Sequence, residues 1–291
     1  LRATASFAIP EALTSITIKH EGKNTALSSL RVAGGSTTEL TATGWYYGNK
    51  VYSADTSFTW SVSDALGTID ADGTFTAVQT GRDVTGTLTV TYGETSCTLP
   101  VTVGSSQPFD DTKGHWAESY ITELYYAGTL QGSEKNGKLY YRPDASMTRQ
   151  EFIVAMMRYL GTDLSAYASV QLPFDDSGSI ASWAKSAMQA AYQLGYLTGS
   201  KTNGKLLAKP GSTISRQEAM TILSRTKDFA DADLNVLSAF SDSGKIADWA
   251  RTALAQMTQQ KIISGSKGKL NPTGKVTRAE VAKMLYMLSE R

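Results

Sequence analysis

The chain has 291 residues, of which 41% are hydrophobic, and its formal net charge is +1 at pH 7. This composition suffices for more than one packed core, and the near-neutral charge gives no electrostatic case for a nucleic-acid partner. The single cysteine, Cys97, excludes an internal disulfide, and no apolar run is long enough to span a membrane. The chain begins Leu1-Arg2-Ala3 without a signal-peptide pattern, so we expect it to be a fragment of a longer protein.

Residues 1–104 are predicted to be all β. Short runs of alternating apolar and polar residues, such as 15–19, 58–62 and 97–103, are separated by Gly, Asn and Asp. Several such runs favour a β-sandwich. The segment Asp70-Ala71-Asp72-Gly73 is predicted to be a hairpin turn. Residues 105–108 are predicted to be a linker, because they are polar and end in proline.

After the linker, one sequence unit occurs three times. Each copy opens with a Phe-Asp/Ser-Asp motif and continues with a tryptophan, a helical-period stretch, a glycine and a proline. The tryptophans are 67 and 66 residues apart, and a fixed period indicates a repeated supersecondary unit. We predict helix, loop, helix in each copy. The recurring residues are Asp111, Asp176 and Asp242; Trp116, Trp183 and Trp249; Gly132, Gly199 and Gly265; and Pro143, Pro210 and Pro272.

The second helix of each copy begins with Thr/Ser-Arg-X-Glu, at residues 148–151, 215–218 and 277–280. This pattern predicts a capping box, in which the hydroxyl residue and the glutamate satisfy free backbone groups. It does not explain Arg149, Arg216 and Arg278, because a cation in the first turn opposes the helix dipole. Two interpretations stand: an ion pair with an Asp of a neighbouring repeat, or a bidentate site for a carboxylate or phosphate. One guanidinium has enough donors for both.

The other recurring residues also have two interpretations each. A tryptophan at a helix start is usually part of the core, but one exposed in a groove would stack on a sugar ring. The last Asp of the opening motif is most simply a cap or turn residue, and alternatively binds a ligand hydroxyl or holds the arginine. The glycines at 132, 199 and 265 are expected to be left-handed helix caps, and they also permit close approach of a ligand.

These repeats resemble the S-layer homology domain over residues 109–291. The resemblance rests on the Phe-X-Asp opening, the helix-opening tryptophan, the aromatic-X-Pro step and Thr277-Arg278-Ala279-Glu280. It implies repeats at 109–165, 174–228 and 240–291, packed as a pseudo-threefold, mainly α-helical unit with grooves between adjacent repeats. It further implies non-covalent anchoring of an exported protein to the bacterial cell wall. The implied ligand is a secondary cell wall polysaccharide carrying ketal-linked pyruvate on N-acetylmannosamine, bound through the motif arginines.

Residues 13–104 resemble a bacterial immunoglobulin-like domain. The resemblance rests on motifs such as Trp60-Ser61-Val62 and Gly73-Thr74-Phe75-Thr76-Ala77. We assign residues 1–104 to this domain, although residues 1–12 alternatively belong to an upstream domain or linker. The aromatic run Trp45-Tyr46-Tyr47 gives slight support to a protein-binding role, but aromatic residues in a strand are usually core.

The repeats depart from the family pattern in two places. The aromatic-X-Pro position holds Tyr141 in the first repeat but Ala208 and Leu270 in the others, which predicts looser loops there. The glycine found at positions 128 and 195 is replaced by Lys261 in the third repeat, which is expected to change that helix end.

No catalytic pattern is found. The two histidines, His20 and His115, lie in different domains, so no histidine-based metal cluster is available, and Asp70-X-Asp72-Gly73 is only a weak calcium candidate. There is no nucleophile elbow or phosphate-binding loop. We therefore expect a non-enzymatic fragment without cofactor or metal, with a catalytic domain upstream as the alternative source of activity. The resemblance to the S-layer homology domain implies an extracellular location at the bacterial cell surface, and we expect the fragment to be monomeric. The alternative function is a structural subunit of a self-assembling S-layer lattice.

Overall fold

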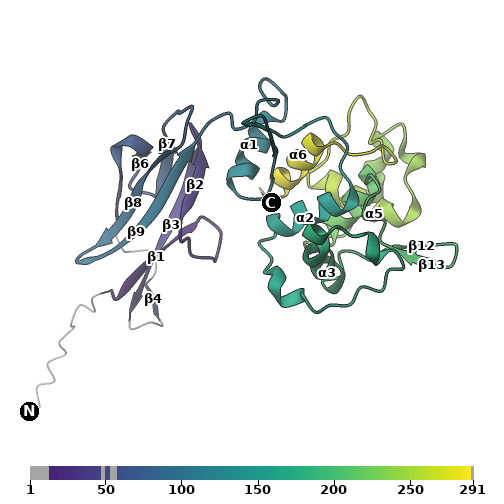
Figure 1. The fold of residues 1–291 in the computed structure, drawn as a ribbon, viewed down its shortest axis with the longest axis horizontal. Helices are drawn as coiled ribbons and strands as arrows, with labels where there is room; N and C mark the ends of the chain where they lie inside the picture. The colour runs from purple at the N-terminus through teal and green to yellow at the C-terminus, as the bar shows by residue number, and fades with distance from the viewer. Residues whose placement is uncertain (1–12, 47–49, 53–57, 290–291) are drawn as a thin grey trace, which may run out of the picture. The chain divides into compact units, whose positions relative to one another are not determined.

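The structure is a computed structural model that describes residues 13–46, 50–52 and 58–289. The chain divides into two compact units, Leu1–Pro108 and Phe109–Arg291. Figure 1 shows strands in the first unit and mainly helices in the second. The expectation for residues 1–12 and the prediction involving Tyr47 lie outside the described residues.

The N-terminal unit consists of two β-sheets. One has the order β1-β3-β7-β6, with β4 also paired to β3, and the other has the order β2-β9-β8-β5. All pairs are antiparallel except β2 with β9. The strands are β1 (Ser15–His20), β2 (Leu30–Ala33), β3 (Thr37–Tyr46), β4 (Lys50–Tyr52), β5 (Thr59–Val62), β6 (Gly67–Ile69), β7 (Thr74–Ala77), β8 (Val84–Tyr92) and β9 (Thr95–Gly104), with the 3-10 turn η1 (Asp64–Leu66) between β5 and β6.

Both sheets contribute to one hydrophobic core. Ile18, Leu40 and Phe75 come from the first sheet, Leu88 and Leu99 come from the second, and all five are at most 2% exposed. Alternate residues of β9 are buried, as the period-two pattern predicts. The predicted turn at 70–73 is confirmed, because it joins the antiparallel strands β6 and β7 and the Gly73 N–H donates to the Asp70 carbonyl at 3.0 Å.

The C-terminal unit repeats a helix-loop-helix arrangement three times, as predicted. The first and second helices are α1 (Glu118–Tyr126) and α2 (Arg149–Tyr159) in the first repeat, α3 (Lys185–Gln193) and α4 (Arg216–Ser224) in the second, and α5 (Asp248–Gln259) and α6 (Arg278–Ser289) in the third. The loops of the first two repeats carry hairpins that were not predicted: β10 (Ser133–Lys135) with β11 (Lys138–Tyr140), and β12 (Ser200–Thr202) with β13 (Lys205–Leu207). Short 3-10 turns precede the first helices of the second and third repeats: η2 (Leu164–Tyr167), η3 (Ser177–Ser179) and η4 (Ser182–Ala184) come before α3, and η5 (Leu234–Ala239) and η6 (Ser243–Lys245) come before α5.

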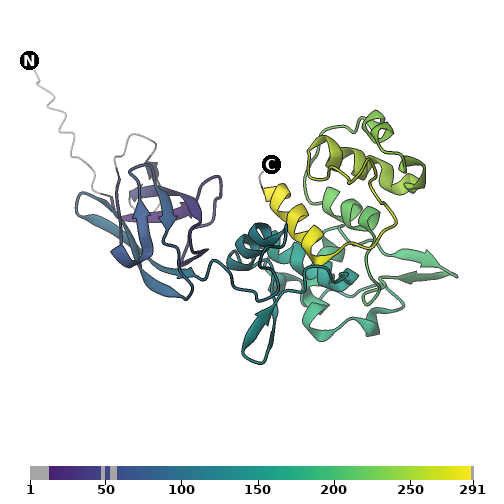
Figure 2. The same cartoon turned by 90° about the horizontal axis from the view of Figure 1, so that it is seen from above.

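The three repeats contact one another in a closed cycle. The first N–H of each second helix donates to a loop carbonyl of the next repeat, and the third repeat returns to the first. The bonds run from Arg149 to Ser212 (2.9 Å), from Arg216 to Gly274 (2.8 Å) and from Arg278 to Ala145 (2.9 Å). One hydrophobic core runs through all three repeats. Figure 2 shows α6, in yellow, beside the helices of the first repeat, and α6 contacts both α1 and α2.

The first helix of each repeat ends in a left-handed residue, but not at the glycines that the sequence indicated. That conformation occurs at Gly128 (φ +75°), Gly195 (φ +78°) and Lys261 (φ +55°). The prediction of helix caps at 132, 199 and 265 is therefore wrong, since these glycines lie several residues further along, although Gly199 (φ +71°) and Gly265 (φ +67°) do adopt the left-handed conformation. The third repeat therefore keeps the helix end of the other two repeats, although Lys261 adopts a left-handed conformation that is unfavourable for residues with a side chain.

Candidate functional site: three grooves between repeats

The second helix of each repeat begins at its motif arginine, and the predicted capping box forms each time. The N–H groups of Thr148, Ser215 and Thr277 donate to the glutamate three residues later at 2.8, 2.8 and 2.9 Å. The Ser215 hydroxyl also donates to Glu218 at 2.6 Å. Because the cap residue holds one carboxylate oxygen of each glutamate, the direction of the second carboxylate oxygen is fixed.

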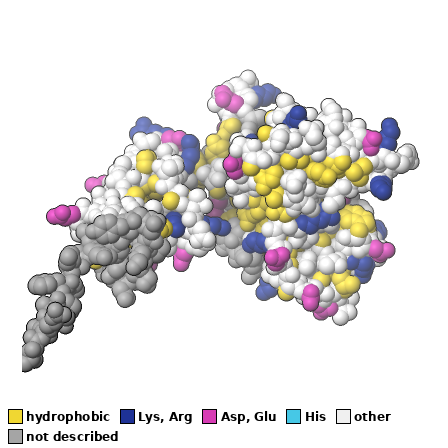
Figure 3. Space-filling model, turned by 90° about the horizontal axis from the view of Figure 1, so that it is seen from below, with side chains coloured by type: hydrophobic (Ala, Val, Ile, Leu, Met, Phe, Trp, Pro, Cys, Tyr) yellow, Lys and Arg dark blue, Asp and Glu magenta, His cyan; other side chains and the backbone are white. Residues whose placement is uncertain are grey.

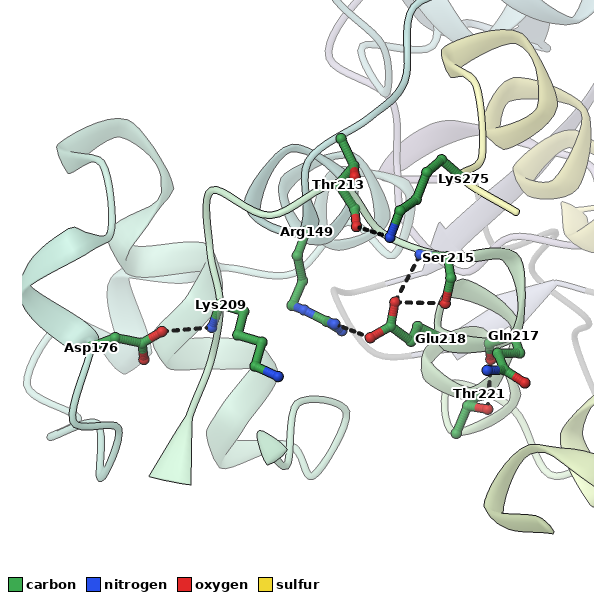
Figure 4. Close-up of polar contacts among 9 residues, drawn as sticks. All are labelled: Arg149, Asp176, Lys209, Thr213, Ser215, Gln217, Glu218, Thr221 and Lys275. Carbon is green, nitrogen blue, oxygen red and sulfur yellow. Dashed lines mark hydrogen bonds and ion pairs between the residues drawn. The ribbon is translucent and has the colours of Figure 1, made fainter. Parts of the chain in front are cut away.

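In two repeats that second oxygen receives the arginine of the preceding repeat. Arg149 forms an ion pair with Glu218, and Arg216 Nη1 lies 2.9 Å from Glu280 Oε1; Figure 4 shows the first pair beside the Ser215 cap. The arginine side chains are 12% and 15% exposed, so both guanidiniums are largely buried. Of the two charge partners considered, the pairing with an Asp is wrong: the partner is the capping glutamate, because only it is aimed at the neighbouring repeat.

The two buried arginines keep unused hydrogen-bonding capacity. Within the described residues, neither Arg149 Nε nor Arg216 Nε has a hydrogen-bond partner, although both atoms are buried. An unsatisfied buried donor costs roughly 1–3 kcal/mol. These groups are therefore paired but not saturated, and an anion reaching either donor would recover part of that cost.

Arg278 is held differently, because its neighbour at the aromatic-X-Pro position is Tyr141. Its guanidinium lies 4.5 Å from the centre of the Tyr141 ring and donates to the backbone carbonyls of Tyr141 (2.7 Å) and Gln131 (2.8 Å). The Tyr141 hydroxyl in turn donates to the Arg278 carbonyl at 3.0 Å. In the described part of the chain no ion pair joins Arg278 to a carboxylate, so its charge is not neutralised by Glu151.

The three recurring aspartates fold the loop that each groove uses. Both oxygens of each carboxylate accept backbone N–H groups from two consecutive residues, of which the second precedes the proline. The bonds of Asp111 to Tyr141 and Arg142 are 2.8 and 2.7 Å, those of Asp176 to Ala208 and Lys209 are both 2.8 Å, and those of Asp242 to Leu270 and Asn271 are 2.9 and 2.8 Å. Arg142, Lys209 and Asn271 have φ between +52° and +58°, so the clamp stabilises an unfavourable backbone.

This finding decides between the non-ligand roles considered for the aspartates. They are turn residues that clamp the aromatic-X-Pro step, and their oxygens point at backbone donors instead of the arginines. Their assignment as ligand contacts stays a prediction.

The recurring glycines pack where no side chain fits. A Cβ at Gly199 would lie 2.6 Å from the Phe174 ring, and one at Gly265 would lie 2.6 Å from the Lys269 carbonyl oxygen. The groups that approach these glycines closely are therefore the opening phenylalanine and the hairpin of the same repeat.

All three recurring tryptophans are exposed. Trp116, Trp183 and Trp249 have exposed fractions of 56%, 57% and 57%, so the core interpretation is wrong for them. Apolar indole surface in water costs free energy, and its recurrence at one position of each repeat favours an external contact. In Figure 3, exposed hydrophobic side chains of this unit lie beside Lys and Arg side chains.

The motif arginines, the capping glutamates, the recurring glycines and the tryptophans line three grooves. Each groove takes its arginine from one repeat, its capping glutamate and glycine from a second repeat, and its tryptophan from the remaining one. We name each groove after its arginine. The Arg149 groove (≈ 350 Å³) combines Arg149 with Gly199, Glu218 and Trp249; the Arg216 groove (≈ 600 Å³) combines Arg216 with Gly265, Glu280 and Trp116; the Arg278 groove (≈ 260 Å³) combines Arg278 with Gly132, Glu151 and Trp183.

The grooves also contain residues that sequence reasoning did not single out. The capping glutamates were assigned only to caps, although two of them, Glu218 and Glu280, also carry the charge that pairs with Arg149 and Arg216. Arg225 lines the Arg149 groove and donates to the Tyr196 carbonyl at 2.8 Å. Repetition alone does not find such residues, because the position of Arg225 is Arg158 in the first repeat but Met287 in the third.

The electrostatics of the site favour ionised carboxylates. Burial by itself would raise the pKa of Glu218, but the bonds from Ser215 and the charge of Arg149 outweigh it, so its pKa lies below the usual range. The same balance holds for Asp242, where burial is outweighed by the backbone N–H groups of Leu270 and Asn271. Each of these groups is therefore an anion at neutral pH.

The described residues contain no group of three or more His, Cys, Asp or Glu side chains suited to a metal ion. None of the helices in this part of the chain has the length and apolarity needed to cross a bilayer.

Comparison with known proteins identifies the repeats. The family model described as S-layer homology domain matches residues 108–153, 173–220 and 239–282. The chain is similar to an amylopullulanase of Thermoanaerobacterium thermosulfurigenes (28% identical over 208 residues, 70% of this chain and 10% of that protein). It is also similar to the exoglucanase XynX of Acetivibrio thermocellus (29% over 190 residues, 64% and 16%) and to the surface-layer 125 kDa protein of Lysinibacillus sphaericus (30% over 129 residues, 43% and 10%). The chain thus spans less than a fifth of each of these relatives.

Proposed function

We propose that this chain, which contains three S-layer homology domains, anchors an exported protein non-covalently to the bacterial cell wall. The anchor would work by binding wall polysaccharide in the three grooves. One observation carries this proposal: every groove joins an arginine at a helix start to a tryptophan that is more than half exposed. An anion-binding helix start and an exposed aromatic face are the two elements needed to hold a charged sugar.

The proposed ligand is a secondary cell wall polysaccharide that carries pyruvate ketals. A ketal-linked pyruvate presents a carboxylate, which matches the bidentate donors of a guanidinium. The sugar ring presents C–H groups to the indole. The ligand contacts that we propose are the arginines 149, 216 and 278, the tryptophans 116, 183 and 249, the aspartates 111, 176 and 242, and the glycines 132, 199 and 265.

Three further features belong to this proposal. The cyclic order of contacts supports a pseudo-threefold arrangement of the repeats. The two antiparallel-rich sheets with a shared core support an immunoglobulin-like sandwich for the N-terminal unit. The chain would act outside the cell, in the wall or surface layer, as a monomeric and non-catalytic module. The enzyme names among its relatives, such as amylopullulanase and exoglucanase, support a module that serves a separate catalytic region.

The second candidate function is a structural role in a surface lattice. It is favoured by the similarity to a protein named as a surface-layer protein. The two functions differ in the remainder of the full-length protein: a hydrolase domain favours the anchor, and a large β-rich region without one favours the lattice.

The test is calorimetry with a monovalent sugar, N-acetylmannosamine with or without its pyruvate ketal. We expect binding only with the ketal. Arg278→Ala should remove one site from the stoichiometry, because truncating one partner of a close charge pair costs about 2–5 kcal/mol. Arg278→Lys should weaken the same site through loss of the bidentate fork. Arg82→Ala, in the N-terminal unit, is the control. Equal affinity for the two sugars would overturn the carboxylate–arginine mechanism.

A further inference from the structure

The loop that borders the Arg216 groove is shorter than its two counterparts. Eight residues separate Gly132 from Tyr141, and eight separate Gly199 from Ala208, but only four separate Gly265 from Leu270. The first two loops form hairpins with three residue pairs each, whereas the third has a single bridge between Ser266 and Lys269. The third hairpin therefore lacks the outer pairs that extend its siblings.

This shortening brings the charges of the turn to the groove. Lys267 and Lys269 line the Arg216 groove. In the second repeat the lysine that follows the turn glycine is Lys205, which lies on β13 and is not among the described residues that line the Arg149 groove. The longer hairpin of the second repeat thus keeps this lysine out of the groove lining, whereas the shorter one of the third repeat places two lysines in it.

Lys267 is held in a conformation that the other repeats assign to asparagine. Its φ is +48°, and Asn136 and Asn203 have φ of +55° and +51° in the corresponding turns. Asparagine tolerates this left-handed region, whereas other side chains pay roughly 1–2 kcal/mol there. A lysine kept in an unfavourable conformation beside a groove is a reason to look for a ligand role.

Helix α6 adds a third lysine to this lining. Lys283 on α6 lines the Arg216 groove, and the residue at its position in the first two repeats is Val154 or Thr221. The lining of this groove thus has four cations against the single carboxylate of Glu280. The Arg278 groove has three (Arg142, Arg158 and Arg278) against Glu151, and the Arg149 groove has two (Arg149 and Arg225) against Glu218. The Arg216 groove is also the largest of the three described grooves, at ≈ 600 Å³.

From these observations we infer that the Arg216 groove binds a stretch of wall glycan bearing two anionic groups, one at Arg216 and one at Lys267, Lys269 and Lys283. This inference rests on the proposed function and adds the ligand class of one groove. A single carboxylate would occupy Arg216 and leave three uncompensated like charges close together. A second anionic group would neutralise them, and the larger volume gives room for a second sugar.

The experiment follows each groove through its own tryptophan. The chain is labelled with 5-fluorotryptophan, so that ¹⁹F NMR reports separately on Trp116, Trp183 and Trp249, assigned by Trp→Phe variants. Two probes with the same sugar backbone are titrated: a disaccharide with a pyruvate ketal on both sugars, and the same disaccharide with one ketal. We expect the Trp116 signal to report at least about tenfold tighter binding of the two-ketal probe, since each added surface charge contact contributes about fivefold. The other two signals should differ by less than about threefold.

A charge-removing variant tests the lysines directly. Lys267→Asn with Lys269→Gln should remove most of the preference for the two-ketal probe and leave one-ketal binding within about twofold. Lys267→Asn also restores the residue of the other repeats, so the turn should fold. Lys205→Gln is the matched control, because this lysine is exposed on a hairpin that lies outside the groove lining.

The outcomes separate the two proposals. Equal affinity of the Arg216 groove for both probes, as reported by Trp116, would overturn the two-anion inference and leave the anchoring function standing. Equal losses of both probes in the double variant would also overturn it, since the lysines would then serve the first carboxylate. Absence of any response from all three tryptophans would overturn the proposed function and this inference with it.

Discussion

Replacing Glu218 with glutamine tests how the Arg149 groove balances stability against anion binding. Glu218 has two tasks: one oxygen accepts from the Ser215 N–H and hydroxyl at 2.8 and 2.6 Å, and the other pairs with Arg149. Glutamine keeps one acceptor oxygen, so it can maintain the capping box. The NH₂ group of its side-chain amide would then take the place of the carboxylate oxygen that faces Arg149, so that two hydrogen-bond donors would lie against each other.

The magnitude follows from burial. Hydrogen bonds to charged groups contribute about 1.5–3 kcal/mol when shielded, and here Arg149 is 12% exposed and Glu218 is 28% exposed. Solvent screening lowers the value for a partly exposed pair, so we expect the free energy of unfolding to fall by about 1–2 kcal/mol. Affinity for an anionic ligand should change in the opposite direction. A ligand carboxylate in the groove would no longer be repelled by the charge of Glu218, and Arg149 would no longer be engaged in the ion pair. Binding should therefore become about fivefold tighter or more.

The assay combines urea unfolding with calorimetry of pyruvylated N-acetylmannosamine. Glu151→Gln is the matched control, because Glu151 fills the same capping position in the Arg278 groove without an ion pair to Arg278. The control should lose less stability and gain less affinity. Weaker ligand binding by Glu218→Gln, or equal effects of the two variants on both measurements, would refute this account of the ion pair.

Three other predictions follow from single features. The pKa of Glu218 lies below its ordinary value of 4.5 in the folded chain, so its contribution to stability is complete above that pH and is lost as pH falls below it; urea titrations at several pH values should show a smaller acid loss in Glu218→Gln, and identical pH profiles would contradict this. Lys261→Gly should raise the free energy of unfolding by about 0.5–1 kcal/mol, because it relieves a left-handed lysine, whereas Gly195→Ala should lower it by a similar amount; thermal melts that rank the two variants the other way would reject the strain. Tyr141→Phe should cost about 1–2 kcal/mol through the lost bond to the Arg278 carbonyl and leave anion binding in that groove nearly unchanged, since the ring stays under the guanidinium; a large loss of binding would show that the hydroxyl, not the ring, positions Arg278.

Local chemistry made the helices of the C-terminal unit predictable. A hydroxyl residue followed three positions later by glutamate satisfies the free N–H groups of a helix start, and α2, α4 and α6 begin at the arginine within that motif. The strands of the N-terminal unit were predictable for a similar reason, because side-chain alternation has a period of two. Both patterns depend on residues only a few positions apart.

The groove partners depend on contacts between distant residues, which a local pattern does not contain. Arg149 meets a glutamate 69 residues later, and Arg278 reaches carbonyl groups 137 and 147 residues earlier. The tryptophans look like core residues by composition, and only the cyclic packing of the repeats leaves them outside. The difference between Tyr141 and Ala208 was visible, but its consequence for an arginine of another repeat required the fold.

Under the proposed anchoring function, the three unequal grooves would act together. A wall polymer would offer many copies of its sugar, so binding in one groove would raise the effective concentration of the next sugar for the others. Loss of one arginine leaves two grooves, and adhesion to intact walls would change little. The grooves also differ in their cations, from two in the lining of the Arg149 groove to four in that of the Arg216 groove, so salt should weaken the Arg216 groove first. A monovalent sugar at several salt concentrations therefore separates the grooves, whereas intact walls report mainly the sum.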